Sequence, residues 1–180
     1  MPRNQFRTVA EELAGLREGR GDAVARFVRD HAPAVLGWCI RLSGPDVDPS
    51  AMAERVMDDA LRRLDQVSAE MPVRAMLLGQ VLAAVAQRES RPWWRRSRAE
   101  DGGGPRARRR VRAALAELPL EQRVALVLVD IEGLRVAGAS ALLGISTGEV
   151  AQRLSSARKS FSDAARREGL DHAALKEGVS

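Results

Sequence analysis

Several residue types are scarce or missing in this chain of 180 residues, and each scarcity excludes a class of protein. Tyr is absent, and aromatic residues make up only 3% of the chain, so the residues that favour β-strands are few. The single cysteine, Cys39, excludes a disulfide framework, and we expect it to be a small buried side chain. With that one cysteine, the two distant histidines His31 and His172 offer no spacing of zinc ligands.

Long apolar runs are missing as well. No run approaches the roughly 20 residues that a helix needs to cross a bilayer, and residues 1–5 lack the apolar segment of a secretory signal. We therefore expect a cytoplasmic protein without membrane insertion. The chain has no glycine loop attached to a strand and no pair of nucleophile and base. We expect no enzymatic activity, no catalytic residues, no cofactor and no metal.

Helix-forming residues are abundant, with Ala, Leu, Arg and Glu dominating the composition. Apolar residues recur at steps of three and four, and proline or glycine sequences separate these stretches. The pattern predicts an all-α fold. We expect His31-Ala32-Pro33 to end one helix, Pro33 to begin the next and Ser50 to cap the one after it. The residues expected to face inward before the break are Val24, Phe27 and Val28.

Positive charge is concentrated in one segment. The net charge is +5, but the residues from Arg91 to Arg112 carry +7, which leaves −2 for the rest of the chain. Residues 99–105 include Gly102-Gly103-Gly104 and show no helical periodicity, so we expect a flexible linker there, inside the basic segment. Localised positive charge favours a polyanion such as nucleic acid, although a solvated Arg-rich linker fits the composition nearly as well.

Two adjacent tryptophans, Trp93 and Trp94, lie in this basic segment and are followed by Arg95 and Arg96. Large aromatic side chains near the end of a helix often cover the end of a core. They also stack on bases while neighbouring arginines hold phosphates. Both interpretations remain open from the sequence.

The stretch from Ala137 to Lys159 has the pattern of a helix-turn-helix. Gly144 turns tightly at little steric cost, and Ser146 can cap the second helix. On the first helix, Ala137, Ala141 and Leu142 form one apolar face, and on the second the buried stripe is Val150, Leu154, Ala157 and Phe161.

The outer face of the second helix is polar and cationic, as a DNA major groove requires. Glu149 argues against close DNA contact at the helix start, because its charge repels phosphate. A helical hairpin with a merely solvated outer face is the alternative. The residues that we expect to contact DNA are Thr147, Gln152, Arg153, Ser156 and Lys159.

Two helical domains, a basic linker and a C-terminal helix-turn-helix together resemble a group IV sigma factor, of the extracytoplasmic-function type. The resemblance covers about residues 22–167. In the second half it rests on Leu118-Pro119 with Gln122-Arg123, on Asp130-Ile131-Glu132-Gly133-Leu134 and on Leu143-Gly144-Ile145-Ser146. In the first half it rests on Asp30 to Leu36, Arg41-Leu42-Ser43-Gly44 and Ala53-Glu54 through Leu64.

The resemblance implies a sigma-2-like bundle and a sigma-4-like helix-turn-helix domain, joined by a flexible basic linker. Its partners would be core RNA polymerase, promoter DNA and an anti-sigma factor. The first domain would bind the polymerase β′ clamp helices and open the promoter near −10, while the second would bind the β flap and read the −35 element. The implied division is an N-terminal extension 1–21, the first domain 22–98, the linker 99–110, the second domain 111–168 and a tail 169–180.

Carried onto this chain, the resemblance places polymerase docking on the helix 51–65 and −35 recognition on 146–160. The residues expected to dock polymerase are Arg55, Asp58, Asp59 and Arg62. Those expected near the −10 DNA are Trp93, Trp94, Arg95 and Arg96.

Some positions depart from the family pattern and motivate other hypotheses. Arg55 stands where an acidic residue is common, Leu61 stands where an aromatic residue is common, and Leu82-Ala83-Ala84 is apolar where the promoter-melting region is polar. The second hypothesis is a degenerate sigma-like interaction protein, acting as a decoy for an anti-sigma factor or as a transcription adaptor. The third is a stand-alone helix-turn-helix DNA-binding regulator.

Overall fold

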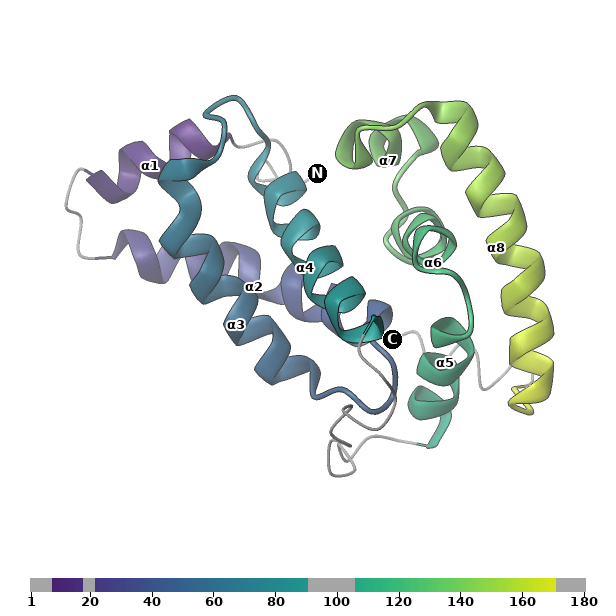
Figure 1. Cartoon of the computed structure of the whole chain (residues 1–180). Helices are drawn as coiled ribbons and strands as arrows, with labels where there is room; N and C mark the ends of the chain where they lie inside the picture. Colours follow the sequence, from purple (N-terminus) through teal and green to yellow (C-terminus); the bar gives the residue numbers. More distant parts are fainter. Residues whose placement is uncertain (1–7, 18–21, 91–105, 171–180) are drawn as a thin grey trace. The chain divides into compact units, whose positions relative to one another are not determined.

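The structure of the protein, a computed structural model, describes residues 8–17, 22–90 and 106–170 (Figure 1). Its elements are helical throughout these ranges, apart from an isolated β-bridge between Thr8 and Pro72. The all-α fold expected from the sequence is confirmed. The chain divides into two units, the first made of residues 1–39 and 49–90, the second of residues 40–48 and 91–180.

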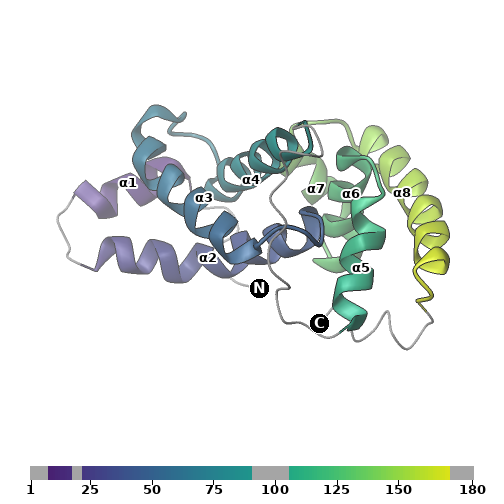
Figure 2. The same ribbon diagram turned by 60° about the horizontal axis from the view of Figure 1, so that its bottom comes forward.

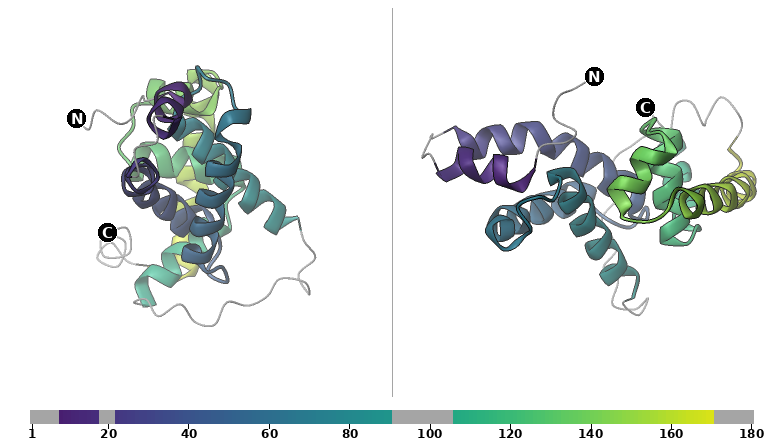
Figure 3. Two further views of the ribbon diagram at one scale, coloured as in Figure 1. Left: turned by 90° about the vertical axis from the view of Figure 1, so that its left-hand side faces the viewer. Right: turned by 90° about the horizontal axis from the view of Figure 1, so that it is seen from above.

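Four α-helices and a short 3₁₀ turn, η2, account for the helical elements described in the first part of the chain. Helices α3 and α4 pack on each other (Figure 3), and their buried side chains, such as Val56, Ala60 and Val81, belong to the core. The elements are α1 (Val9–Arg17), α2 (Ala23–Leu42), α3 (Pro49–Arg63), η2 (Leu64–Gln66) and α4 (Val73–Glu89).

Helix α2 runs without a break through Pro33, so the expected helix end at this proline is wrong. Proline lacks the N–H that would bond to the preceding turn, which weakens a helix interior. Here, however, one stripe of α2 is almost fully buried both before and after the proline in sequence. It includes Phe27, Val35 and Trp38. Burial of such side chains contributes about 1.5–3 kcal/mol each, enough to offset one lost hydrogen bond.

The same stripe explains why two other inward assignments are wrong. Val24 is 50% exposed and Val28 is 38% exposed, whereas Phe27 is 1% exposed and His31 is 2% exposed. Once the helix continues past Pro33, the steps from Phe27 to His31 and Val35 define its buried side. Val24 and Val28 then lie on the flank.

The beginnings of two helices also differ from the sequence expectation. Helix α3 begins at Pro49, so Ser50 lies inside its first turn and is not the cap. Helix α1 belongs to the first unit: Val9 is fully buried, and its N–H donates to the Met71 carbonyl at 3.0 Å. Part of the expected N-terminal extension therefore packs on the unit that follows it.

The second unit contains five described helical elements, and α8 packs against α5, α6 and α7 (Figure 2). Helix α5 begins at Arg106, inside the stretch expected to be linker, because Val111, Ala114 and Leu115 are buried in the core of the unit. The elements are α5 (Arg106–Ala116), α6 (Leu120–Leu126), the π-helical turn η4 (Val127–Ile131), α7 (Val136–Leu143) and α8 (Thr147–Arg167).

Arg123 of α6 is the charged side chain that lies deepest among the described residues, with 1% of its surface exposed. Its guanidinium donates to the carbonyls of Ala116 at 3.0 Å, of Leu118 at 2.8 Å, and of Leu42. These bonds from the two terminal nitrogens offset part of the cost of burying the charge. Arg123 thereby joins the end of α5 to the start of α6, and both to the segment 40–48 of the same unit.

Among the described residues, every helix is too short or too polar to span a lipid bilayer. That part of the chain also lacks any group of three or more His, Cys, Asp or Glu side chains placed to hold a metal ion.

Candidate nucleic-acid interface

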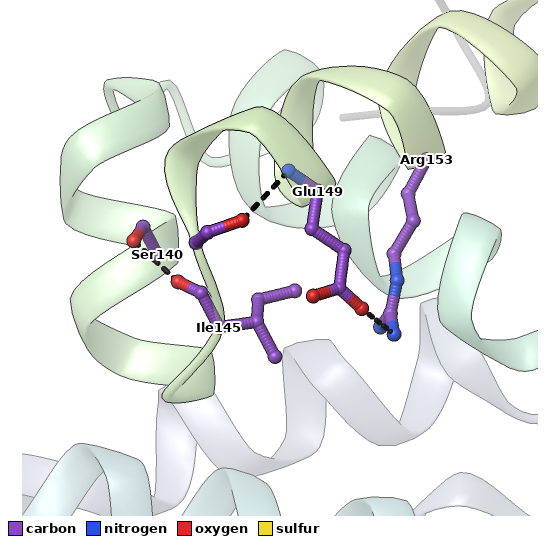
Figure 4. A network of polar contacts seen from close by, with 5 residues as sticks. Ser140, Ile145, Glu149 and Arg153 are labelled. Carbon is purple, nitrogen blue, oxygen red and sulfur yellow. Dashed lines mark hydrogen bonds and ion pairs between the residues drawn. The ribbon is translucent and has the colours of Figure 1, made fainter.

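The turn between α7 and α8 has the geometry that the sequence predicts. Gly144 has φ 67° and ψ 27°, a left-handed conformation that strains any residue with a side chain. Its N–H donates to the Ser140 carbonyl at 2.9 Å, and the Ser140 hydroxyl donates to the Ile145 carbonyl at 2.5 Å (Figure 4). These bonds end α7 and fix the angle at which the chain leaves it.

Helix α8 starts at a side-chain cap, which confirms the role expected for Ser146. The Ser146 hydroxyl oxygen accepts a hydrogen bond from the Glu149 backbone N–H at 3.1 Å. A cap of this kind satisfies one of the free N–H groups of the first turn and is worth about 1 kcal/mol. The first turn of α8 is therefore held in place beside the turn that precedes it.

The inner side of α8 also agrees with the expected stripe. Val150 and Ala157 are fully buried, Leu154 is 5% exposed, and Phe161 packs partly buried against the same core. For α7 the expected face is wrong, because Ala137 and Ala141 are exposed, whereas Ala139 is buried. Nearly every residue of this short helix is apolar or small, so periodicity does not identify its inner side, and packing against α8 decides it.

The outer side of α8 is a polar strip, which we call the α8 strip: Gln152, Ser155, Ser156 and Lys159, all exposed. Thr147, the first residue of the helix, is also exposed but lies on another side of it. Gln152, Ser156 and Lys159 follow one another at steps of four and three, so they share one face over two helical turns. Amide, hydroxyl and ammonium groups on such a face match the acceptors of base edges and phosphates. Three of the five side chains expected to contact DNA, Gln152, Ser156 and Lys159, thus lie together on α8, and the fourth, Thr147, is exposed in its first turn.

The fifth, Arg153, lies at the edge of the strip and has a partner. Its Nη2 atom lies 2.5 Å from Oε1 of Glu149, one helical turn earlier, and the two side chains meet along the helix (Figure 4). Their exposed fractions are 31% and 43%. The carboxylate that was expected to oppose DNA contact is therefore balanced by an adjacent guanidinium.

A second arginine of α8 connects the helix to the π-helical turn. Arg158 donates from Nε and Nη2 to the two carboxylate oxygens of Asp130, at 2.9 and 2.7 Å. The hydrogen bond and the charge of Asp130 raise the pKa of Arg158. Both residues also line a hollow of this unit, whose apolar lining includes Leu115, Leu126 and Phe161. Pattern reading missed this pair because it joins residues 28 apart in sequence.

In the first unit, the four residues expected to dock polymerase all lie exposed on α3. Asp59 and Arg62 form an ion pair at 3.0 Å, and Nε of Arg55 donates to the Ala51 carbonyl at 3.2 Å. With Asp58, they form a solvent-facing surface of mixed charge. The residues expected near the −10 DNA, Trp93, Trp94, Arg95 and Arg96, lie outside the described residues.

Comparison with known families gives one match in the second unit. Residues 108–161, which include α6, α7 and most of α5 and α8, match the model of sigma-70, region 4. Two curated relatives from Mycobacterium tuberculosis, strains Erdman and H37Rv, are both named ECF RNA polymerase sigma factor SigM. Each is 44% identical over 48 residues, or 27% of this chain, and the matched stretch spans about a quarter (24%) of the relative's length.

Solved structures with a similar fold extend over both units. CnrH, in complex with the cytosolic domain of CnrY, matches with a TM-score of 0.63 and 24% identity, covering 88% of this chain and 98% of that chain. The sigma factor RpoE, in complex with the anti-sigma factor NepR from Bartonella quintana, matches with a TM-score of 0.57 and 17% identity, covering 81% and 98%. These likenesses establish the fold.

Proposed function

We propose that this chain is a sigma factor of the extracytoplasmic-function group of the sigma-70 family, which binds core RNA polymerase and directs it to promoters. The observation that carries the proposal is the α8 strip on a capped second helix, within the stretch that matches sigma-70 region 4. In a helix-turn-helix, the second helix enters the major groove and its N-terminal residues contact base edges. We assign the α8 strip, with Arg153, to the −35 element.

The polymerase contact is assigned to the exposed face of α3. Charged side chains on such a surface give orientation and a high association rate, provided that the partner carries the complementary pattern. Arg55 lies there beside two acidic residues, Asp58 and Asp59, so a complementary polymerase surface would carry both signs of charge. We further assign an anti-sigma factor as a regulatory partner, because RpoE, a protein of the same fold, is found in complex with one.

The proposal is tested by co-elution of the full chain with bacterial core RNA polymerase on size exclusion, with a standard sigma factor as competitor. We expect co-elution that the competitor abolishes. Reversing the charge of Asp58 and Asp59 to lysine should weaken co-elution, whereas Asp163→Lys, on the far end of α8, should not. A folded chain that never co-elutes would contradict the proposal.

The proposed recognition of the −35 element by α8 is tested by a separate measurement, transcription. The test is the double variant Arg153→Ala and Lys159→Ala, which should still co-elute with polymerase. Its transcription from promoters recovered with the wild-type holoenzyme should fall at least tenfold, because each lost base or phosphate contact costs about 1–3 kcal/mol. Arg166→Ala serves as the control, because its side chain is 78% exposed at the other end of the same helix. Unchanged transcription by the double variant would contradict the −35 assignment.

A second candidate is the sigma-like interaction protein without promoter opening. It is favoured by the apolar side chains at Leu82-Ala83-Ala84 and by Leu61, since opening DNA requires groups that capture unstacked bases. This candidate predicts tight binding to an anti-sigma factor and no transcription from any promoter by the reconstituted holoenzyme.

A further inference from the structure

The carboxylate of Glu149 makes an unusual contact for its position in α8. Ser146 and Glu149 have the spacing of a capping box, in which the acidic side chain ordinarily bonds back to the N–H of the cap residue. The serine half of this motif is formed, with the hydroxyl 3.1 Å from the Glu149 N–H. The side chain of Glu149 instead accepts a hydrogen bond from Arg153, one turn further along α8.

Arg153 is held at the place where α8 changes from its buried to its exposed side. Its neighbours in sequence are Gln152, exposed on the α8 strip, and Leu154, buried in the core. A guanidinium carries five N–H donors in a fixed fork, and the contact with Glu149 uses one of its terminal nitrogens. Arg153 therefore keeps N–H donors for a second acceptor. The carboxylate of Glu149 meanwhile restricts the orientations of the Arg153 guanidinium.

An unrestrained arginine on this face would bind any phosphate of the DNA backbone, which gives affinity without sequence information. A carboxylate next to it repels phosphates, yet it is compatible with a guanine edge, whose O6 and N7 accept two bonds from one guanidinium. Pairing with a carboxylate therefore shifts an arginine from backbone contact towards base contact.

We propose that Glu149 is a specificity-determining residue, which positions Arg153 for a guanine in the major groove and disfavours its contact with phosphate. The inference rests on the proposed DNA-reading function of α8. It assigns a positive role to the acidic residue that by charge alone opposes DNA binding. Glu149 acts through Arg153, so it is a positioning residue.

The test compares two charge-neutralising variants of α8 in the full chain, reconstituted with core RNA polymerase. Glu149→Gln removes the negative charge beside Arg153, whereas Asp163→Asn removes the negative charge 3.7 Å from Arg166, near the other end of the helix. The probe is a pool of duplexes randomised upstream of a fixed downstream promoter segment, sequenced after selection. A second probe is one fixed duplex of unrelated sequence, titrated at several salt concentrations.

We expect the wild-type holoenzyme to enrich a motif that contains guanine at one defined position. Glu149→Gln should lower the preference for that guanine about tenfold, raise the affinity for the unrelated duplex and steepen its salt dependence by about one unit of slope, as a new phosphate contact would. Asp163→Asn should retain the wild-type motif and preference.

A purely structural role for the ion pair is distinguished by a double-variant cycle. In an Arg153→Gln background, Glu149→Gln should have no further effect on the preference, because the residue through which it acts is gone. Thermal melting of each variant measures helix stability independently. A structural role would lower the melting temperature and reduce binding to both probes by the same factor.

The outcomes separate this inference from the proposed function. If the wild type enriches a motif and Glu149→Gln enriches the same motif with equal preference, the inference is overturned and the −35 assignment stands. An effect of Glu149→Gln that persists in the Arg153→Gln background also overturns it. If the wild-type holoenzyme enriches no upstream motif, the proposed reading of DNA by α8 fails, and the inference fails with it.

Discussion

Cys39 is fully buried in α2, and its burial raises the pKa of the thiol from 9.0 to about 12, although the positive charge of Arg55 acts in the opposite direction. In the unfolded chain the thiol loses its proton near the lower value. The native state therefore binds more protons than the unfolded state between these two pKa values. This contribution to stability is complete below pH 9 and is lost as the pH rises towards 12.

The free energy of unfolding should consequently fall by about 1 kcal/mol between roughly pH 8 and pH 10 through this thiol alone. Few other groups ionise in that interval, because the chain has no tyrosine and its lysines are Lys159 and Lys176. Urea unfolding followed by circular dichroism at both pH values measures the effect. Cys39→Ala is the control, since it removes the thiol. An equal loss of stability in wild type and variant would show that Cys39 is not the cause.

At the scale of the element, α2 offers a direct test of how much stability a helix loses when proline lies in its interior. Pro33 is exposed, so Pro33→Ala leaves the buried stripe intact while it restores an N–H donor for the preceding turn. Alanine is also a better helix former by about 3 kcal/mol, but the freer unfolded chain offsets part of this gain. We expect the free energy of unfolding to rise by about 1–2 kcal/mol.

Thermal and urea unfolding of the Pro33→Ala variant give this number. The matched control is Ala51→Gly, an exposed position in the first turns of α3, which should lower stability by about 1 kcal/mol and so confirm that the assay resolves helix propensity. A loss of stability in Pro33→Ala would mean that the proline fixes a bend on which the packing of α2 depends.

The elements that the sequence predicted well are those determined by neighbouring residues. The turn at Gly144 and the cap at Ser146 depend on chemistry within a few residues, and both are present as expected. The buried stripe of α8 was also predictable, because the polar and apolar residues of this helix are sharply separated. For these features, the chemistry of neighbouring residues was sufficient to predict the structure.

Other features depend on contacts that are distant in sequence, and pattern reading did not find them. Continuation through Pro33 depends on what the whole of α2 buries, and the inner side of α7 depends on α8. Arg123 was visible as part of a motif, but its burial was not, since its acceptors come from Leu42, Ala116 and Leu118. The pairing of Glu149 with Arg153 was predictable from their i, i+4 spacing, and it was missed because Glu149 was considered only as a repulsive charge.

At the scale of the whole molecule, the question is whether DNA binding follows the net charge of +5 or the place where the charge lies. The start of α5 carries exposed arginines at 106, 108 and 110, next to the basic stretch that precedes it in sequence. Each arginine that contacts a phosphate releases a counterion and makes binding more dependent on salt. A local basic surface and a diffuse positive charge therefore predict different responses to substitution.

Replacing Arg106, Arg108 and Arg110 with glutamine should weaken binding of the holoenzyme to an unrelated duplex and reduce its salt slope by up to about three units. The control replaces three exposed arginines elsewhere, Arg29, Arg63 and Arg166, so that both variants lower the net charge equally. Fluorescence anisotropy over a range of salt concentrations measures both slopes. We expect the control to change the slope by less than about one unit, because screening confines electrostatic attraction to about 10 Å. Equal slopes in the two variants would assign DNA affinity to the net charge of the chain, and the start of α5 would then be an ordinary solvated helix end.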